Sequence, residues 1–247
     1  MGVCALTLAG CSNAKKDAQS AIDASNKIKS GQTYVTSTSQ TSAATGATTS
    51  VSEGTFTSNP FRAEMNQINQ NQSKNQYYVD NGVLYTSMKN KWYKAKLGNS
   101  SNFIKNAKAT LTGTSNTFLL KELKNNFKES TSGNNIVLSY SGTDSTASNF
   151  AKKYFLYLSN NKNASTVNKA SFKSLKFTYK MNKKTYLPVS CSISVKYASS
   201  AKAAVNTSNV DSTYGSINKV NSVAIPQGII SSAKPLPKQV QSLLLAQ

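Results

Sequence analysis

The stretch QYYVDNGVLYTSMKNKWYKAK, residues 76–96, decides the fold because it reads as three short antiparallel strands joined by two tight turns. Asp80-Asn81-Gly82 supplies residues that tolerate the positive φ angles of a hairpin turn. Lys89-Asn90-Lys91 forms the second turn, and aromatic and aliphatic residues flank both turns. The stretch therefore predicts a three-stranded meander.

Further strands are expected on both sides of this meander. The alternation of apolar and polar residues predicts them, although in the range 171–181 the phase slips once between Phe172 and Leu175. Pro60 marks an edge or a bulge in its strand. The low-complexity stretch 42–54 is expected to form a long hairpin tip. The predicted strands are residues 33–41, 55–68, 135–141, 171–181, 185–197 and 203–224, and the last range is either one long strand or a strand pair.

Helical spacing of apolar residues predicts five helical segments, at residues 15–29, 101–107, 117–129, 143–160 and 237–246. The first precedes the strands and three lie between the meander and the long C-terminal strands. This order predicts an α+β fold, with helices set against one face of a single large antiparallel sheet.

The charge of the chain is strongly positive but diffuse. The formal net charge is +20 over 247 residues, and Arg62 is the one arginine among the 29 basic residues. Nucleic-acid readers favour arginine, whose planar fork fits bases and phosphates, so we expect no nucleic-acid partner. A coat of scattered lysines instead suits a protein beside a polyanion, such as an anionic wall polymer or a membrane surface.

The N-terminal residues have the features of an export signal. Residues 3–10, VCALTLAG, are apolar and too short to span a bilayer, as in the apolar part of a signal peptide. The following Cys11 completes a Leu-Ala-Gly-Cys pattern that resembles the bacterial lipobox. We expect residues 1–10 to be a signal-peptide remnant and 11–247 the mature lipoprotein, anchored to the membrane through a lipidated Cys11.

Two further observations belong to this N-terminal region. No Lys or Arg precedes the apolar run, so the natural reading frame is expected to extend upstream with basic residues. The alternative is that these residues form the first turn of a core helix with a buried cysteine.

The sequence offers few groups for catalysis, so we expect no enzyme activity, catalytic residue, metal or cofactor. Histidine is absent, which removes the commonest general base and metal ligand. None of the nine carboxylates stands out as one of a pair, and a glycosidase needs two of them facing one site. Cys191 is expected to be a small core residue in a strand. A serine–lysine pair stays open as an alternative.

Five segments together resemble a known family. They are the lipobox, DASNKIKS (23–30), YYVDNGVLYTSMKNKWYKA (77–95), FTYKMNKKTYLPVSCSISVKY (177–197) and INKVNSVAIP (217–226). In this order they are similar to the Gram-positive lipoproteins of a domain-of-unknown-function family with the LolA-like fold, related to LolA, LolB and the mycobacterial LppX and LprG. The resemblance covers residues 14–230 and leaves a C-terminal tail.

The resemblance implies a strongly curved antiparallel sheet, an unclosed half-barrel, with helices packed on its concave side. In characterised relatives the enclosed cavity holds acyl chains, so a lipid or other hydrophobic ligand is the expected partner of a monomeric protein on the extracytoplasmic face of a Gram-positive membrane. The ten residues expected to line such a cavity are Tyr78, Val83, Tyr85, Trp92, Phe118, Leu120, Phe155, Phe177, Tyr179 and Ile193.

An alternative function stays open at this point. The same ten residues can form an ordinary filled core, and the lysine-rich surface can bind anionic wall polymer or lipid head groups. The volume of the interior distinguishes the two, since a cavity of several hundred Å³ favours a carried ligand.

Overall fold

The structure is a computed structural model, and it describes residues 11–42, 46–70, 74–159, 163–200 and 202–246. The signal-peptide prediction for residues 1–10 lies outside the described residues. The described helices are α1 (Cys11–Ser25), α2 (Asn102–Thr112), α3 (Thr114–Glu122), α4 (Ser145–Leu158), α5 (Ala164–Lys169), α6 (Gln227–Ser232) and α7 (Lys238–Ala246).

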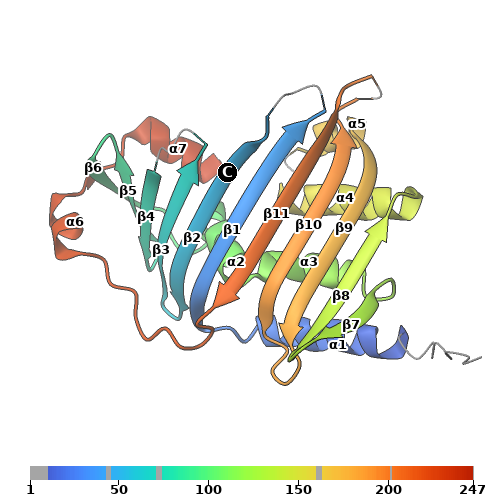
Figure 1. The fold of residues 1–247 in the computed structure, drawn as a ribbon. Helices are drawn as coiled ribbons and strands as arrows, with labels where there is room; N and C mark the ends of the chain where they lie inside the picture. The colour runs from blue at the N-terminus through green and yellow to red at the C-terminus, as the bar shows by residue number, and fades with distance from the viewer. Residues whose placement is uncertain (1–10, 43–45, 71–73, 160–162, 201, 247) are drawn as a thin grey trace, which may run out of the picture. The chain divides into compact units, whose positions relative to one another are not determined.

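Within the described residues, twelve strands form one unclosed sheet in the order β12-β6-β5-β4-β3-β2-β1-β11-β10-β9-β8-β7 (Figure 1). They are β1 (Ser30–Thr41), β2 (Thr48–Ser58), β3 (Phe61–Asn69), β4 (Lys74–Asp80), β5 (Val83–Met88), β6 (Lys91–Lys96), β7 (Lys128–Ser132), β8 (Asn135–Gly142), β9 (Ser171–Asn182), β10 (Pro188–Ala198), β11 (Val205–Gly215) and β12 (Lys234–Pro235). The short β12 pairs parallel to β6, so the sheet is mixed. The predicted fold class is otherwise confirmed.

The 76–96 meander is confirmed as β4, β5 and β6. Asn81 and Gly82 make the first turn with φ angles of 45° and 84°, and Lys89 and Asn90 make the second with 50° and 61°. Residues Tyr77 to Asp80 pair with Thr86 to Val83, in the register that a two-residue turn imposes.

Several sequence predictions were wrong in detail. The strand expected over 55–68 is two strands, because β2 ends at Ser58 and β3 begins at Phe61, so Pro60 lies in the turn between them. The final strand expected over 203–224 is β11 alone, which ends at Gly215.

The 42–54 stretch is not all hairpin tip, because β2 begins at Thr48, while residues 43–45 lie outside the described residues. The helix expected over 117–129 ends at Glu122, and Lys128 begins β7. Pairing of Lys128–Ser132 with β8 and burial of Phe127 against Phe177, at 5.8 Å between ring centres, favour a strand over the helical pattern.

The described chain folds into two compact units, each built from separate stretches of sequence. Unit 1 comprises the described residues of Met1–Asn26, Ser39–Ala47 and Asn116–Asp211. Unit 2 comprises those of Lys27–Thr38, Thr48–Ser115 and Ser212–Gln247. The expectation of one domain over residues 14–230 stays a prediction.

Unit 1 has a filled core. The inward side chains of β8, β9 and β10 alternate with outward polar ones, and α4 packs against β8 and β9 while α1 contacts β7 (Figure 1). The inward residues are 0–2 % exposed from Leu175 to Met181 and from Cys191 to Val195. Such burial leaves little room for a ligand.

Candidate functional site

In unit 2 the helix α2 lies against β2 and has a well-defined start and end. The Ser101 side chain caps its first turn by accepting a hydrogen bond from the Ile104 backbone N–H at 3.4 Å. Gly113 ends the helix with a φ of 72°, the left-handed conformation that glycine adopts without a steric penalty. Ile104 and Leu111, seven residues apart, are both buried.

Two contacts fix the C-terminal half of α2 on the sheet. The Thr33 hydroxyl of β1 donates a hydrogen bond of 2.6 Å to the carbonyl oxygen of Leu111. A methyl group on Gly54 of β2 would collide with the Leu111 side chain, so glycine at this position permits the close approach.

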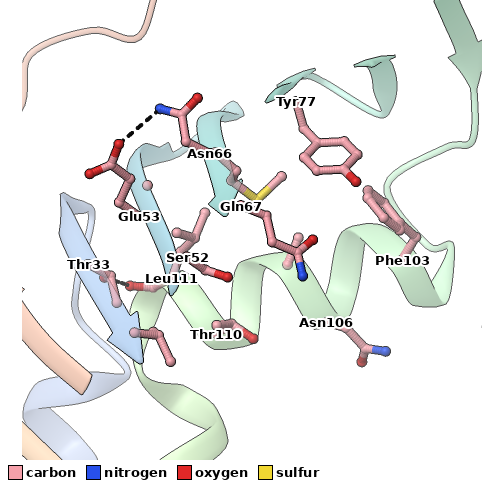
Figure 2. Close-up of a pocket in the computed structure, with 14 residues that line it drawn as sticks. Thr33, Ser52, Glu53, Asn66, Gln67, Tyr77, Phe103, Asn106, Thr110 and Leu111 are labelled. Atoms are coloured by element: carbon pink, nitrogen blue, oxygen red, sulfur yellow. Dashed lines mark hydrogen bonds between the residues drawn. The ribbon is translucent and has the colours of Figure 1, made fainter. Parts of the chain in front are cut away.

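A cavity of about 390 Å³ lies between α2 and the strands β1 to β4 (Figure 2). We call it the α2 cavity. Its volume falls within the usual range for small-ligand sites, roughly 300–1,000 Å³. Its lining residues are Thr33, Val35, Ser52, Glu53, Gly54, Met65, Asn66, Gln67, Tyr77, Phe103, Asn106, Ala107, Thr110 and Leu111.

Strand alternation divides this lining into two sets. Gly54 pairs with Met65, which pairs with Tyr77, so these three share the face of the sheet that α2 covers. Glu53 and Asn66 pair with each other on the opposite face, where the Asn66 amide donates a 3.3 Å hydrogen bond to the Glu53 carboxylate. Figure 2 shows both side chains turned away from α2. Among the described lining residues, none therefore points a carboxylate into the cavity.

The inside of the cavity is apolar at its floor and polar at its edge. Val35, Met65, Phe103, Ala107 and Leu111 supply the apolar contacts. Neutral polar groups come from Ser52, Gln67, Tyr77, Asn106 and Thr110. This combination of apolar surface with a few hydrogen-bonding groups is typical of sites for amphiphilic ligands.

Tyr77 and Phe103 form an aromatic pair on one side of the cavity, with ring centres 6.4 Å apart and planes tilted by 54°. Burial raises the pKa of the Tyr77 phenol above its ordinary value of 10.0. The hydroxyl therefore stays protonated at neutral pH, and in Figure 2 it makes no hydrogen bond to the other residues drawn. It is a neutral donor and acceptor.

None of the ten residues expected to line a cavity is among those that line this one. Four of them lie in the meander of unit 2, on the face opposite Tyr77. Tyr78 pairs with Tyr85, Val83 lies two residues before Tyr85, and Trp92 pairs with Ser87, two residues after it. Tyr78 is 5 % exposed, contacts Trp92 and donates a 3.2 Å hydrogen bond to Glu64.

The other six lie in unit 1 and contribute to its core. Leu120, Phe177, Tyr179 and Ile193 are at most 2 % exposed. Phe118 stacks on Tyr157, and the Phe155 ring contacts those of Phe172 and Tyr197, with ring centres 5.3 and 5.2 Å away. Their role in ligand binding stays a prediction.

The sequence contained a signal that shows which of Tyr77 and Tyr78 lies on the inward face of the meander. Asp80 shares the face of Tyr78, and Lys94 and Lys96 pair with Tyr85 and Val83 on that same face. Charged residues mark the outward face of a strand, so the inward residues of the meander are those in register with Tyr77. The lining residues on α2 had no such signal, because only tertiary packing places that helix over the strands.

Other kinds of site find little support in the described residues. Within them, no group of three or more His, Cys, Asp or Glu side chains is arranged to hold a metal ion. The described helices include none with both the length and the apolar character needed to cross a membrane.

Comparison with protein families gives a match over residues 14–234, to a family of unknown function, DUF6612. The chain belongs to this family. No curated protein matches its sequence.

Among solved structures, the lipoprotein LppX from Mycobacterium tuberculosis is similar, with a TM-score of 0.50 and 12 % identity over 86 % of this chain and 98 % of that one. LprF from Mycobacterium bovis matches with a TM-score of 0.47 and 11 % identity over 87 % and 97 % of the two chains. At such low identity the likeness to LppX establishes the fold alone. The predicted LolA/LppX-like fold is thereby confirmed for this DUF6612 protein.

Proposed function

We propose that this DUF6612 protein is a non-catalytic, membrane-anchored extracytoplasmic lipoprotein that binds a lipid or other hydrophobic ligand in the α2 cavity. The observation that supports it is the contrast between the two units. The sheet core of unit 1 is packed with side chains, and its pocket of about 440 Å³ is lined by residues of α4 alone. Unit 2 contains a cavity of about 390 Å³ between α2 and its strands, with an apolar floor. Protein interiors are normally close-packed, so a cavity of this size is unusual and is explained if it holds a ligand.

The anchoring part of the proposal rests on the sequence. Cys11 ends the Leu-Ala-Gly-Cys pattern and begins α1. LppX, which has the same fold, is itself described as a lipoprotein. Two acyl chains on Cys11 would hold the protein on a Gram-positive membrane, because each buried CH₂ group contributes about 0.8 kcal/mol.

Filling the cavity tests the binding proposal. Ala107 lines the cavity, whereas Ala109, at about 100° per residue, points to the other side of α2. Ala107→Leu should weaken binding of the neutral fluorescent probe Nile red by about tenfold, since the added side chain occupies the site. Ala109→Leu is the matched control and should bind as the wild type does. Equal binding by both variants would refute the assignment of this cavity.

Metabolic labelling tests the anchor. Cells that express the protein with its full signal sequence are grown with radioactive palmitate, and the Cys11→Ala variant should lose the label and leave the membrane fraction. Cys191→Ser is the control and should keep both. Label retained by Cys11→Ala would contradict the anchoring proposal.

A second candidate function, binding to an anionic wall polymer, is favoured by one face of unit 1. Lys176 and Lys180 alternate with the buried Phe177 and Tyr179 on β9, and so point outward. Lys196 of β10 pairs with Ser174 on the same side, and neither β9 nor β10 contains an acidic residue. This lysine face has no acidic neighbour within its own strands.

Polyphosphate binding tests this second candidate. Lys176→Glu with Lys180→Glu should weaken binding in low salt more than the control pair Lys219→Glu with Lys234→Glu in unit 2. Raising the salt should abolish binding, because exposed charges are screened beyond about 8 Å at physiological ionic strength. Salt-independent binding, or equal losses in both double variants, would rule out the lysine face.

A further inference from the structure

The charges around the α2 cavity are unexpected for so basic a protein. None of its 14 lining residues is Lys or Arg, although the chain has a net charge of +20. The ionisable residues in the lining are Glu53 and Tyr77. Glu53 lies on the far face of the sheet, and Tyr77 stays neutral.

The two lysines near the middle of α2 do not supply the positive charge that the lining of the α2 cavity lacks. Phe103, Ala107 and Thr110 mark the side of the helix that faces the cavity. At about 100° per residue, Lys105 falls on the opposite side. The Lys108 ammonium group lies 5.9 Å from the centre of the Phe61 ring, and Phe61 is not part of the lining. A head group at the cavity edge therefore meets no nearby cation among the described lining.

The edge does offer neutral hydrogen-bonding groups from both walls. Gln67 of β3 and Asn106 of α2 each carry an amide with two donor hydrogens and an acceptor oxygen, although Figure 2 shows the Asn106 side chain directed away from Gln67. In Figure 2 the Gln67 amide points from the strand toward the part of α2 between Thr110 and Asn106. Ser52 and Thr110 add hydroxyl groups. These groups match hydroxyls, amides and esters.

Desolvation decides between charged and uncharged head groups at such an edge. An anion that loses water without gaining a cation pays a large penalty, while a hydroxyl or amide recovers its hydrogen bonds from Gln67 and the neighbouring polar groups. The distant lysines contribute little, since solvent and salt screen exposed charges.

We infer that the α2 cavity selects amphiphiles with an uncharged, hydrogen-bonding head group, such as a monoacylglycerol, over lipids whose head group is a carboxylate or a phosphate. The inference rests on the proposed function, namely that this cavity binds a hydrophobic ligand.

Three probes with the same palmitoyl chain test the selection: 1-monopalmitoylglycerol, palmitate at pH 8 and palmitoyl-lysophosphatidylglycerol, each below its micellar concentration. Displacement of Nile red should show binding of the neutral probe at least about tenfold tighter than of either anion. Equal or tighter binding of an anion, with Nile red still bound in the cavity, would overturn the selection and leave the proposed function standing. Failure of Nile red and all three probes to bind would overturn both.

A charge inserted at the edge provides the second test. Gln67→Lys should raise the affinity for palmitate relative to monopalmitoylglycerol by at least about tenfold, because the ammonium group pairs with the carboxylate. Asn125→Lys, an exposed position in unit 1, adds the same charge elsewhere and should leave the ratio unchanged. Asn106→Lys, on the exposed surface of α2, is the replacement edge variant if Gln67→Lys does not fold. An unchanged ratio in a folded edge variant would overturn the inference.

Discussion

At the scale of single residues, two carboxyl groups that are far apart in sequence meet in unit 1. Asp17 of α1 is 7 % exposed, and Glu129 of β7 faces it with one carboxyl oxygen buried and without a hydrogen-bond partner. Burial, together with the neighbouring Asp17, raises the pKa of Glu129 above its ordinary value of 4.5. No pattern in the sequence pairs these two residues.

This pair predicts that Glu129→Gln increases the free energy of unfolding by an amount that depends on pH. The folded state holds the Glu129 proton more tightly than the unfolded state does, so this group's contribution to stability is full below about pH 4.5 and is lost as the pH rises through the raised pKa. A neutral glutamine escapes that loss. The variant should raise the free energy of unfolding by about 0.5 kcal/mol at pH 7, a small value for a partly exposed group, and by nothing near pH 4.

Urea unfolding at both pH values measures this gain. Asp23→Asn, on the exposed side of α1, is the control and should show no such dependence. A gain of equal size at pH 4 and pH 7 would show that charge is not its cause.

Cys191 gives a second prediction at this scale. It is 2 % exposed, and burial together with Asp211 raises the pKa of its thiol, so both access and thiolate formation are suppressed. This confirms the sequence prediction of a core residue. In a variant with Cys4→Ser and Cys11→Ser, iodoacetamide at pH 8 should label Cys191 only after urea unfolding. Rapid labelling of the native protein would contradict this burial.

At the scale of elements, local sequence signals set where helices begin and where a strand bends. The Asp144 carboxylate accepts a 2.9 Å hydrogen bond from the Ala147 backbone N–H and so caps α4. In β9 the pairing with β10 passes from Ser174 to Phe172 between Lys196 and Tyr197, so Lys173 is an extra residue. This bulge explains the slip in alternation between Phe172 and Leu175.

The cap leads to a prediction for α4. Asp144→Ala leaves the first-turn N–H groups without this acceptor and should lower the free energy of unfolding by about 1 kcal/mol, measured by urea unfolding. Ser145→Ala, at the next position, makes the same kind of truncation without removing the cap and should cost less than about 0.5 kcal/mol. Similar losses in both variants would mean that the cap contributes nothing.

At the scale of the whole molecule, the main feature is that the sheet core of unit 1 is filled, whereas unit 2 contains a cavity between α2 and its strands. Leu138 in unit 1 is 0 % exposed, whereas Met65 in unit 2 lines the α2 cavity and is half-buried. Removing a side chain from a packed core costs both lost burial and a new void. Removing one from an existing cavity costs only part of the burial.

Leu138→Ala should therefore lower the free energy of unfolding by about 3 kcal/mol, and Met65→Ala by about 1 kcal/mol. Urea unfolding without ligand measures both values. A loss at Met65 as large as that at Leu138 would show that the cavity is closed by packing in solution.

The sequence by itself determined the elements whose cues are local. Asn81-Gly82 specified the meander turn, Asp144 specified the start of α4, and the alternation around Phe177 specified β9. These elements depend on residues that are neighbours in the sequence. The order of the elements along the chain was enough to indicate the LolA-like fold. The start of β7 was misjudged because Lys128–Ser132 takes its hydrogen-bond partners from β8.

Only the tertiary structure decided where the empty space lies. Adjacent residues of a strand point to opposite faces, so choosing Tyr78 over Tyr77 selected the side away from α2. The cavity also needs α2 placed over β2, which depends on the Gly54 contact with Leu111 and on the hydrogen bond from Thr33. Those contacts join residues 57 and 78 positions apart, which no local pattern in the sequence records.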